Sequence, residues 1–181
     1  MFDRIVRAIR LDPTLYRMVA DDEEYTSEGV IIILIVAAIS ALGAALEALG
    51  GNGRPVVTFI VQLANTLVLG WLLWAVIAYF VGTALGGKSG IAEMARTLAY
   101  ANTPGLLGLF APIPCLGPIL LLAAFVLTIA AGVVAIRESM EFDTTKALVT
   151  AVIGFGVFIV VRVIIGFVMG GVGVIGSVFL R

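Results

Sequence analysis

The stretch Gly86–Pro104, GGKSGIAEMARTLAYANTP, is the polar interruption in the middle of a strongly apolar chain. It opens on the pair Gly86-Gly87, which favours a turn, and closes on Pro104-Gly105, where a regular helix is kinked or broken. The residues between have a helical pattern with three polar side chains on one face: Glu93, Arg96 and Tyr100. Whether this stretch enters the membrane or lies on its surface decides the topology.

The sequence on both sides of this stretch is suited to lipid. Of 181 residues, 61% are hydrophobic and 13% are charged, whereas a soluble domain is about half apolar and about one quarter charged. Apolar runs long enough to span a hydrocarbon core of about 30 Å recur along the chain. The sequence therefore predicts an all-α, polytopic membrane helix bundle: five transmembrane helices with a short N-terminal interfacial amphipathic helix.

Two segments are expected. In residues 1–25, apolar side chains recur at helical spacing beside arginines, which is typical of a cytoplasmic interfacial segment. Residues 26–181 form the five-span domain and end in a glycine-rich tail. The expected spans are 28–49, 56–82, 91–112, 117–136 and 146–169.

The distribution of basic residues favours five spans over four. With the N-terminus in the cytoplasm, five spans place Lys88, Arg96, Arg137 and Lys146 on the cytoplasmic side. Four spans would move Arg137 and Lys146 outside, against the positive-inside rule. Five spans also place the C-terminus outside and give the third span a proline kink near its middle.

Charged and small residues within the spans predict specific contacts. Arg162 follows Lys146 by sixteen residues, about 24 Å along a helix, so it should lie at the depth of Glu47 at the far end of the first span. An ion pair between these two side chains is expected, or extension of both into the headgroups. Asn102 is a further polar candidate, and a cytoplasmic cluster of Glu93 and Arg96 with the acids of residues 138–143 is expected. A GxxxG pair offers a helix-packing face: Gly166 and Gly170.

Several function classes lack support in the sequence. The chain has no histidine and a net charge of −1, so no nucleic-acid partner, metal site or cofactor is predicted. The candidate nucleophiles Ser89, Ser139 and Cys115 have no recognisable base. We expect no enzymatic activity.

Four parts of the chain resemble the Yip family, the Ypt/Rab-interacting integral membrane proteins, and its short prokaryotic members above all. They are the lead-in RLDPTLY at 10–16, Gly86-Gly87, the segment AYANTP at 99–104, and Ser139 with TTKA at 144–147. The resemblance implies five spans, a cytoplasmic N-terminus and the prokaryotic cytoplasmic (inner) membrane. Eukaryotic members bind Rab GTPases in vesicle trafficking and carry a long N-terminal region with an Asp-Leu-Tyr-Gly-Pro-like motif. Residues 1–25 offer neither, so a Rab-type GTPase partner is not expected.

Two functions follow from these patterns. The first is a non-enzymatic membrane scaffold or accessory subunit, which would contact the lipid bilayer and other membrane proteins or a second copy of itself. The alternative is a small-solute or ion transporter or channel that uses the polar groups around the kinked third span, because broken helices line substrate sites in transporters.

Overall fold

The computed structural model describes residues 1–50, 53–110, 113 and 115–179, and the side-chain surroundings of these residues up to Val168. Within these ranges the chain is helical, with short turns and no strand. The elements are α1 (Phe2–Ile9), α2 (Pro13–Asp21), α3 (Tyr25–Leu49), α4 (Pro55–Ala64), η1 (Asn65–Leu72), α5 (Leu73–Ala84), α6 (Ile91–Ala101), η2 (Thr103–Phe110), α7 (Leu116–Ser139) and α8 (Thr144–Phe179). The all-α class predicted from the sequence is confirmed.

Four helical stretches of the described chain are long and apolar enough to cross a membrane. They are α3, the continuous run Pro55–Ala84, α7, and α8 through Val168. The run Pro55–Ala84 contains a π-helical segment, η1, between α4 and α5. Most large apolar side chains of these helices remain exposed, as expected for surfaces that face lipid.

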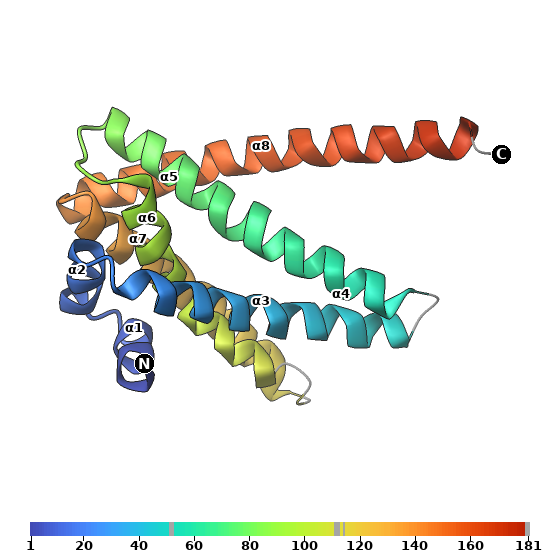
Figure 1. The fold of residues 1–181 in the computed structure, drawn as a ribbon, viewed down its shortest axis with the longest axis horizontal. Helices are drawn as coiled ribbons and strands as arrows, with labels where there is room; N and C mark the ends of the chain where they lie inside the picture. Colours follow the sequence, from blue (N-terminus) through green and yellow to red (C-terminus); the bar gives the residue numbers. More distant parts are fainter. Residues whose placement is uncertain (51–52, 111–112, 114, 180–181) are drawn as a thin grey trace.

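Residues 91–112, expected as one kinked span, form two shorter elements up to Phe110, while Ala111 and Pro112 lie outside the described residues. The α-helix α6 ends at Ala101 and the 3-10 helix η2 begins at Thr103. Both elements pack along α7 (Figure 1). The segment is therefore broken where the proline signal placed the kink.

At the break, a side chain donates to the carbonyl group that has lost its backbone donor. Pro104 has no N–H and cannot donate to the carbonyl of Tyr100, four residues earlier. Instead, the hydroxyl of Thr103 donates to that carbonyl. Asn102 Nδ2 donates to the carbonyl of Leu98 at 2.8 Å. Thr103 thus replaces the helical hydrogen bond that Pro104 cannot make, whereas Asn102 adds a second donor to a carbonyl that already accepts from its own backbone N–H at 3.2 Å.

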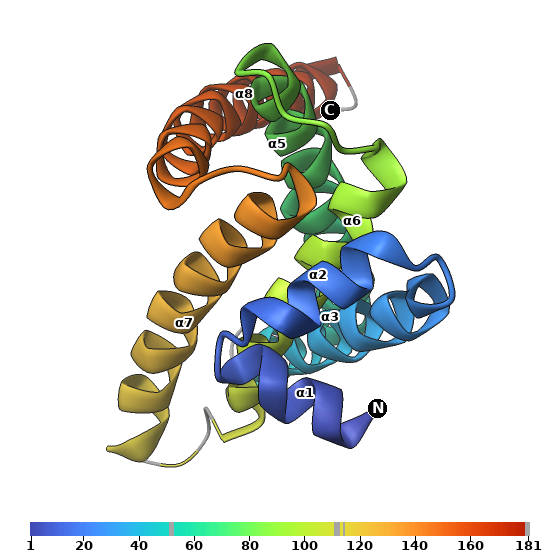
Figure 2. The same ribbon diagram turned by 90° about the vertical axis from the view of Figure 1, so that its left-hand side faces the viewer.

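The buried core lies at one end of the bundle. Here α1 and α2, together called the N-terminal arm, cover α6 and α7 (Figure 2). Leu15, Tyr16 and Val19 of α2 are fully buried against Met94 and Ile136. The arm is thus two helices rather than the single short interfacial helix expected for residues 1–25, and α2 packs on protein.

The arm divides into two helices at a defined turn. Leu11 has a positive φ of 59°, and Pro13 opens α2 in its first turn, a position that suits proline. Asp12 caps α2 by accepting a hydrogen bond from the backbone N–H of Thr14 at 3.0 Å. Arg7 Nε also donates to Asp12 at 2.8 Å, which ties α1 to the start of α2.

Candidate functional site

Arg96 is the centre of the best-defined polar site. Its side chain, on α6, is only 4% exposed. Nε donates to the carbonyl of Val19 at 2.6 Å and Nη2 to the carbonyl of Ala20 at 2.6 Å. Nη1 donates to the hydroxyl of Thr26 at 3.1 Å. One buried guanidinium thus joins α6 to the end of α2 and the beginning of α3.

The partners of Arg96 are neutral oxygens at a helix C-terminus. The last carbonyls of a helix lack intrahelical donors, and the helix dipole makes this end negative. A cation with several N–H groups meets both needs. Burial of an arginine is costly unless its donors are satisfied, so the site holds the arm in one fixed position.

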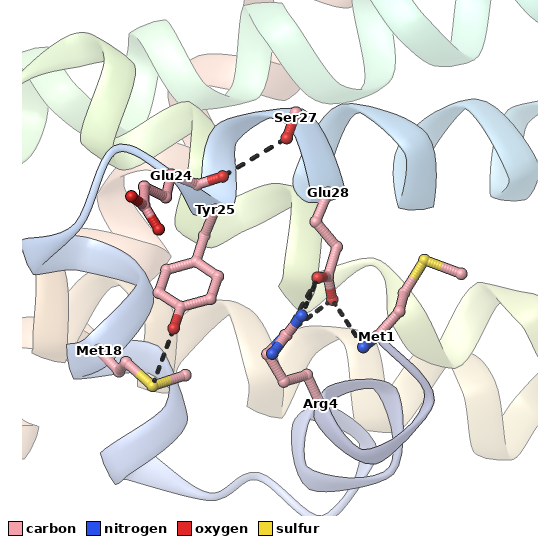
Figure 3. Close-up of polar contacts among 7 residues, drawn as sticks. All are labelled: Met1, Arg4, Met18, Glu24, Tyr25, Ser27 and Glu28. Carbon is pink, nitrogen blue, oxygen red and sulfur yellow. Dashed lines mark hydrogen bonds and ion pairs between the residues drawn. The ribbon is translucent and has the colours of Figure 1, made fainter.

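A second contact fixes the other helix of the arm. Arg4 on α1 donates to both carboxylate oxygens of Glu28 on α3, with Nε 3.0 Å and 3.1 Å from them (Figure 3). The amino group of Met1 lies 3.9 Å from the same carboxylate. The Arg4 guanidinium also stacks 5.2 Å from the ring centroid of Tyr25. The hydrogen bonds to Glu28 raise the pKa of Arg4, so the pair stays ionised.

A third contact joins the arm to the turn between α7 and α8. Arg17 donates through Nη2 to Glu141 at 2.9 Å and through Nη1 to the carbonyl of Glu138 at 3.1 Å. The hydrogen bond from Arg17 lowers the pKa of Glu141. Three arginines, Arg4, Arg17 and Arg96, therefore attach the arm to α3, α7 and α6. We call this set the arm-docking site.

Tyr100 lies next to this site, one turn beyond Arg96. Its ring packs against Gly29 of α3, where a Cβ would come within 3.5 Å of Cε2 of Tyr100. Its hydroxyl is buried and has no hydrogen-bond partner among the described residues. Arg96 and Tyr100 therefore share the face predicted from the sequence, and that face contacts the arm and α3.

The acidic residues expected near Arg96 lie elsewhere. Glu93 turns back and accepts a hydrogen bond from the N–H of Gly90 at 3.2 Å, so it caps its own helix. Glu138 pairs with Arg137 at 2.7 Å. The expected cluster of Glu93 and Arg96 with the acids of residues 138–143 is not formed in the described structure, because α2 lies between them and supplies Arg96 with carbonyl groups.

The expected ion pair between Glu47 and Arg162 is also wrong. Nη1 of Arg162 donates instead to the side-chain amide oxygen of Asn65 at 2.9 Å. Glu47 is exposed at the end of α3 and forms no ion pair within the described residues. The depth estimate could not show that α8 faces η1 at this level rather than α3.

The turn and kink glycines have steric roles. Gly86 has a φ of +91°, which favours glycine. A Cβ at Gly87 would collide with Met140 and Phe142, and one at Gly105 would lie 2.7 Å from Val36 Cγ1. The predicted turn at Gly86-Gly87 and the break at Pro104-Gly105 thus coincide with close contacts to α7 and α3.

The GxxxG pair makes no contact of its own within the described side chains. A Cβ at Gly166 would meet no atom within 4 Å, and the surroundings of Gly170 lie outside the described residues. Packing of this pair against another helix stays a prediction. No group of three or more metal-ligating side chains occurs in the described part of the chain.

Sequence reasoning missed the arm-docking partners. The sequence marks Arg4 and Arg17 only as basic residues of the N-terminal segment, and it predicts no contact for Glu28. The signal available was the position of the two arginines, which lie on the short helices α1 and α2 among apolar residues. The sequence likewise predicts no contact for Asn65, which lies within the second expected span.

The fold and this site define an α-helical membrane protein with a docked N-terminal arm. Residues 9–179 match the family model described as the Yip1 domain. The chain therefore belongs to the Yip1 domain family, as the sequence motifs predicted. Neither the curated proteins nor the solved structures include a match.

Proposed function

We propose that this protein is a non-enzymatic membrane scaffold or accessory subunit that crosses the bilayer five times. The scaffold role rests on the exposure of apolar side chains in the second half of α8. From Val157 to Val168 most of its large apolar side chains are exposed: Val163 is 64% exposed and Phe167 84% exposed. Gly166 lies between them with open space at its Cβ position. Small residues on an apolar helix allow another helix to approach closely in lipid.

The topology rests on which turns lie at the same end of the bundle. The N–H of Lys88, before α6, donates to the carbonyl of Met140, after α7, at 3.4 Å. Arg17 of the arm contacts Glu141 in the same turn. These contacts support an arrangement in which the arm, the α5–α6 loop and the α7–α8 turn share one side of the membrane. If α7 crosses the membrane, the chain then crosses an odd number of times between Lys88 and Leu116. This supports α6 and η2 as the third crossing.

The length of the broken segment supports the same topology. α6 has 11 residues and η2 has 8 residues, which together span about 32 Å at the rises of α- and 3-10 helices. That matches a hydrocarbon core of about 30 Å. The basic residues of the arm favour a cytoplasmic position for this side, and we propose the cytoplasmic membrane of a prokaryote as the location of the protein.

Three polar side chains of the apolar segments have structural partners. Arg96 holds the arm, Gln62 donates to Ser40 at 3.1 Å, and Asn102 donates to its own helix. They come from different levels of the bundle rather than from one path. The arrangement therefore favours a scaffold over a transporter.

The test is the size of the complex after gentle extraction from the native membrane, measured by native electrophoresis and mass spectrometry. We expect an assembly larger than one chain, and we expect Gly166→Leu to reduce it. Val149→Leu, at an exposed position nearer the start of α8, is the matched control. A wild-type protein that runs as a lone chain, or a Gly166→Leu variant with an unchanged assembly, would contradict the proposal. Flux of a solute through liposomes of purified protein would favour the transporter instead.

A further inference from the structure

Arg162 is a cation within a membrane-spanning helix, and its hydrogen-bonded partner is neutral. Nη1 donates to Asn65, and the guanidinium carbon lies 5.7 Å from the ring centroid of Phe158. A guanidinium has five N–H donors, and the described residues supply an acceptor to one of them. A cation without a neutralising partner is costly in hydrocarbon. An anion that accepts hydrogen bonds from the remaining N–H groups of Arg162 would remove this cost.

The backbone opposite Arg162 has an unusual conformation. Asn65 is the first residue of the π-helical segment η1. Such turns are rare and occur frequently at functional sites. A hollow of about 450 Å³ lies on the same face of this helix and is lined by Gln62, Asn65 and Val68, among others. Asn65, the hydrogen-bond partner of Arg162, thus borders open space that also adjoins the side-chain amide of Gln62.

Phe158 connects Arg162 to an apolar cavity. The cavity has a volume of about 360 Å³ and is lined by residues of η1, α5, α6, α7 and α8. Some of these residues, such as Phe125 and Val152, are exposed, so the cavity is partly open. Phe158, on which the guanidinium stacks, forms part of its wall together with Trp74 and Leu148. Gly132 of α7 also lines it, and a Cβ there would meet no atom within 4 Å. The volume falls in the range of ligand pockets, about 300–1,000 Å³.

We infer that Arg162 binds the phosphate of a membrane phospholipid whose acyl chain occupies this cavity. A guanidinium can donate two parallel hydrogen bonds to two phosphate oxygens, and Asn65 fixes its orientation. The residues of α8 that line the cavity, from Leu148 to Phe158, precede Arg162. The acyl chain of the lipid therefore runs from the phosphate toward the start of α8. This is the orientation of a lipid in the leaflet that lies away from the start of α8. The inference requires only that α8 crosses the membrane and is independent of the scaffold role.

The test is a titration of delipidated, purified protein with phosphatidylglycerol, followed by native mass spectrometry. The wild type should bind one lipid preferentially. Arg162→Gln should weaken that binding by about tenfold or more, because hydrogen bonds to ions and bidentate pairs are the strong ones. The matched control is Arg10→Gln, at an exposed arginine of the arm. Arg162→Lys, which keeps the charge but loses the planar fork, should weaken binding less and replaces the glutamine variant if that one does not fold.

A second variant tests the cavity separately from the charge. Gly132→Leu fills the space for the acyl chain, so it should also weaken lipid binding while Arg162 is intact. Unchanged binding in either Arg162→Gln or Gly132→Leu would overturn the assignment. Inorganic phosphate should not displace the lipid at equal concentration; if it does, the site binds a free anion and not a phospholipid.

Discussion

Arg17 on α2 and Glu141 in the turn between α7 and α8 form an ion pair of 2.9 Å across 124 positions of sequence. The pair places the arm and this turn at the same end of the bundle. Because α7 ends at that turn, the C-terminal end of α7 lies at the same end of the bundle as the arm. This ion pair and the contacts of Arg96 and Arg4 together make the arm an integral part of the fold.

Replacing Arg96 should release the arm from the bundle. Arg96→Met leaves the carbonyls of Val19 and Ala20 buried without donors, so we expect a loss of about 3 kcal/mol or more, since each hydrogen bond to a charged group contributes roughly 1.5–3 kcal/mol. Thermal unfolding in detergent measures the loss. A glutamate-specific protease should then cut at Glu23 and Glu24 faster than in the wild type.

The matched control for this variant is Arg10→Met, which changes an exposed arginine of the same arm. It should unfold and be cleaved like the wild type. Equal protease sensitivity of the Arg96 and Arg10 variants would show that the buried guanidinium does not hold the arm.

The arm should loosen in acid because of Asp12. Hydrogen bonds from Thr14 and Arg7 lower the pKa of Asp12 from 3.8 to about 2. A group with a lowered pKa in the folded state stabilises it above its ordinary pKa, and this contribution is lost as the pH falls toward the lowered value. Hydrogen exchange of α1 and α2 amides should therefore rise, relative to α7, as the pH falls from about 4 to about 2.

Asp12→Asn tests the assignment of this pH dependence. Its arm should exchange faster at neutral pH and change less on acidification, because the asparagine does not titrate. Asp3→Asn, at an exposed aspartate of α1, serves as the control and should keep the wild-type profile. An unaltered profile in Asp12→Asn would assign the acid effect to another group.

The glycine at the break of the third segment should not tolerate a side chain. In Gly105→Ala the new Cβ would lie 2.7 Å from Val36 Cγ1, and overpacking of this kind costs typically about 1–3 kcal/mol. Gly43→Ala, on the same helix α3 as Val36, meets no atom within 4 Å. It should be neutral or stabilising by a few tenths to about 1 kcal/mol. Thermal unfolding of the two variants in one detergent compares them; equal stabilities would argue against close packing of η2 on α3.

Thr103 should matter only while Pro104 is present. Thr103→Val removes the hydroxyl that donates to the carbonyl of Tyr100, at a cost of about 1 kcal/mol. Pro104→Ala restores an N–H that can donate to the same carbonyl. In a double-mutant cycle measured by thermal unfolding, Thr103→Val should therefore cost less in the Pro104→Ala background; strict additivity would mean that the hydroxyl does not replace the lost bond.

Apolar length and proline chemistry made the larger part of this fold predictable. Runs of lipid-compatible residues marked the four long helices, and Pro104 marked the break in the third segment because proline removes a specific N–H. The face shared by Arg96 and Tyr100 followed from helical spacing. The family followed from short motifs distributed over most of the chain.

The contacts of the polar residues could not be predicted in the same way. Spacing along one helix gives the face of a side chain and not the helix opposite, so Arg162 was paired with Glu47 by depth although η1 lies across from it. The arm was placed at the lipid surface because its arginines and apolar residues alternate, yet that pattern equally suits a helix that packs on protein and pairs its charges. The π-helical segment has no sequence signal that distinguishes it from the α-helices around it.

We propose that the arm and the α7–α8 turn lie on one side of the membrane and that the start of α7 lies on the other. Cysteine accessibility in sealed, oriented vesicles measures this directly. Glu23→Cys and Asp143→Cys are made in a Cys115→Ser background, and the native Cys115, which is exposed just before α7, reports the opposite end in the wild type. We expect cysteines at positions 23 and 143 to react with an impermeant maleimide from the cytoplasmic side. We expect Cys115 to react only from the external side. Labelling of residues 23 and 143 from opposite sides would contradict the proposal.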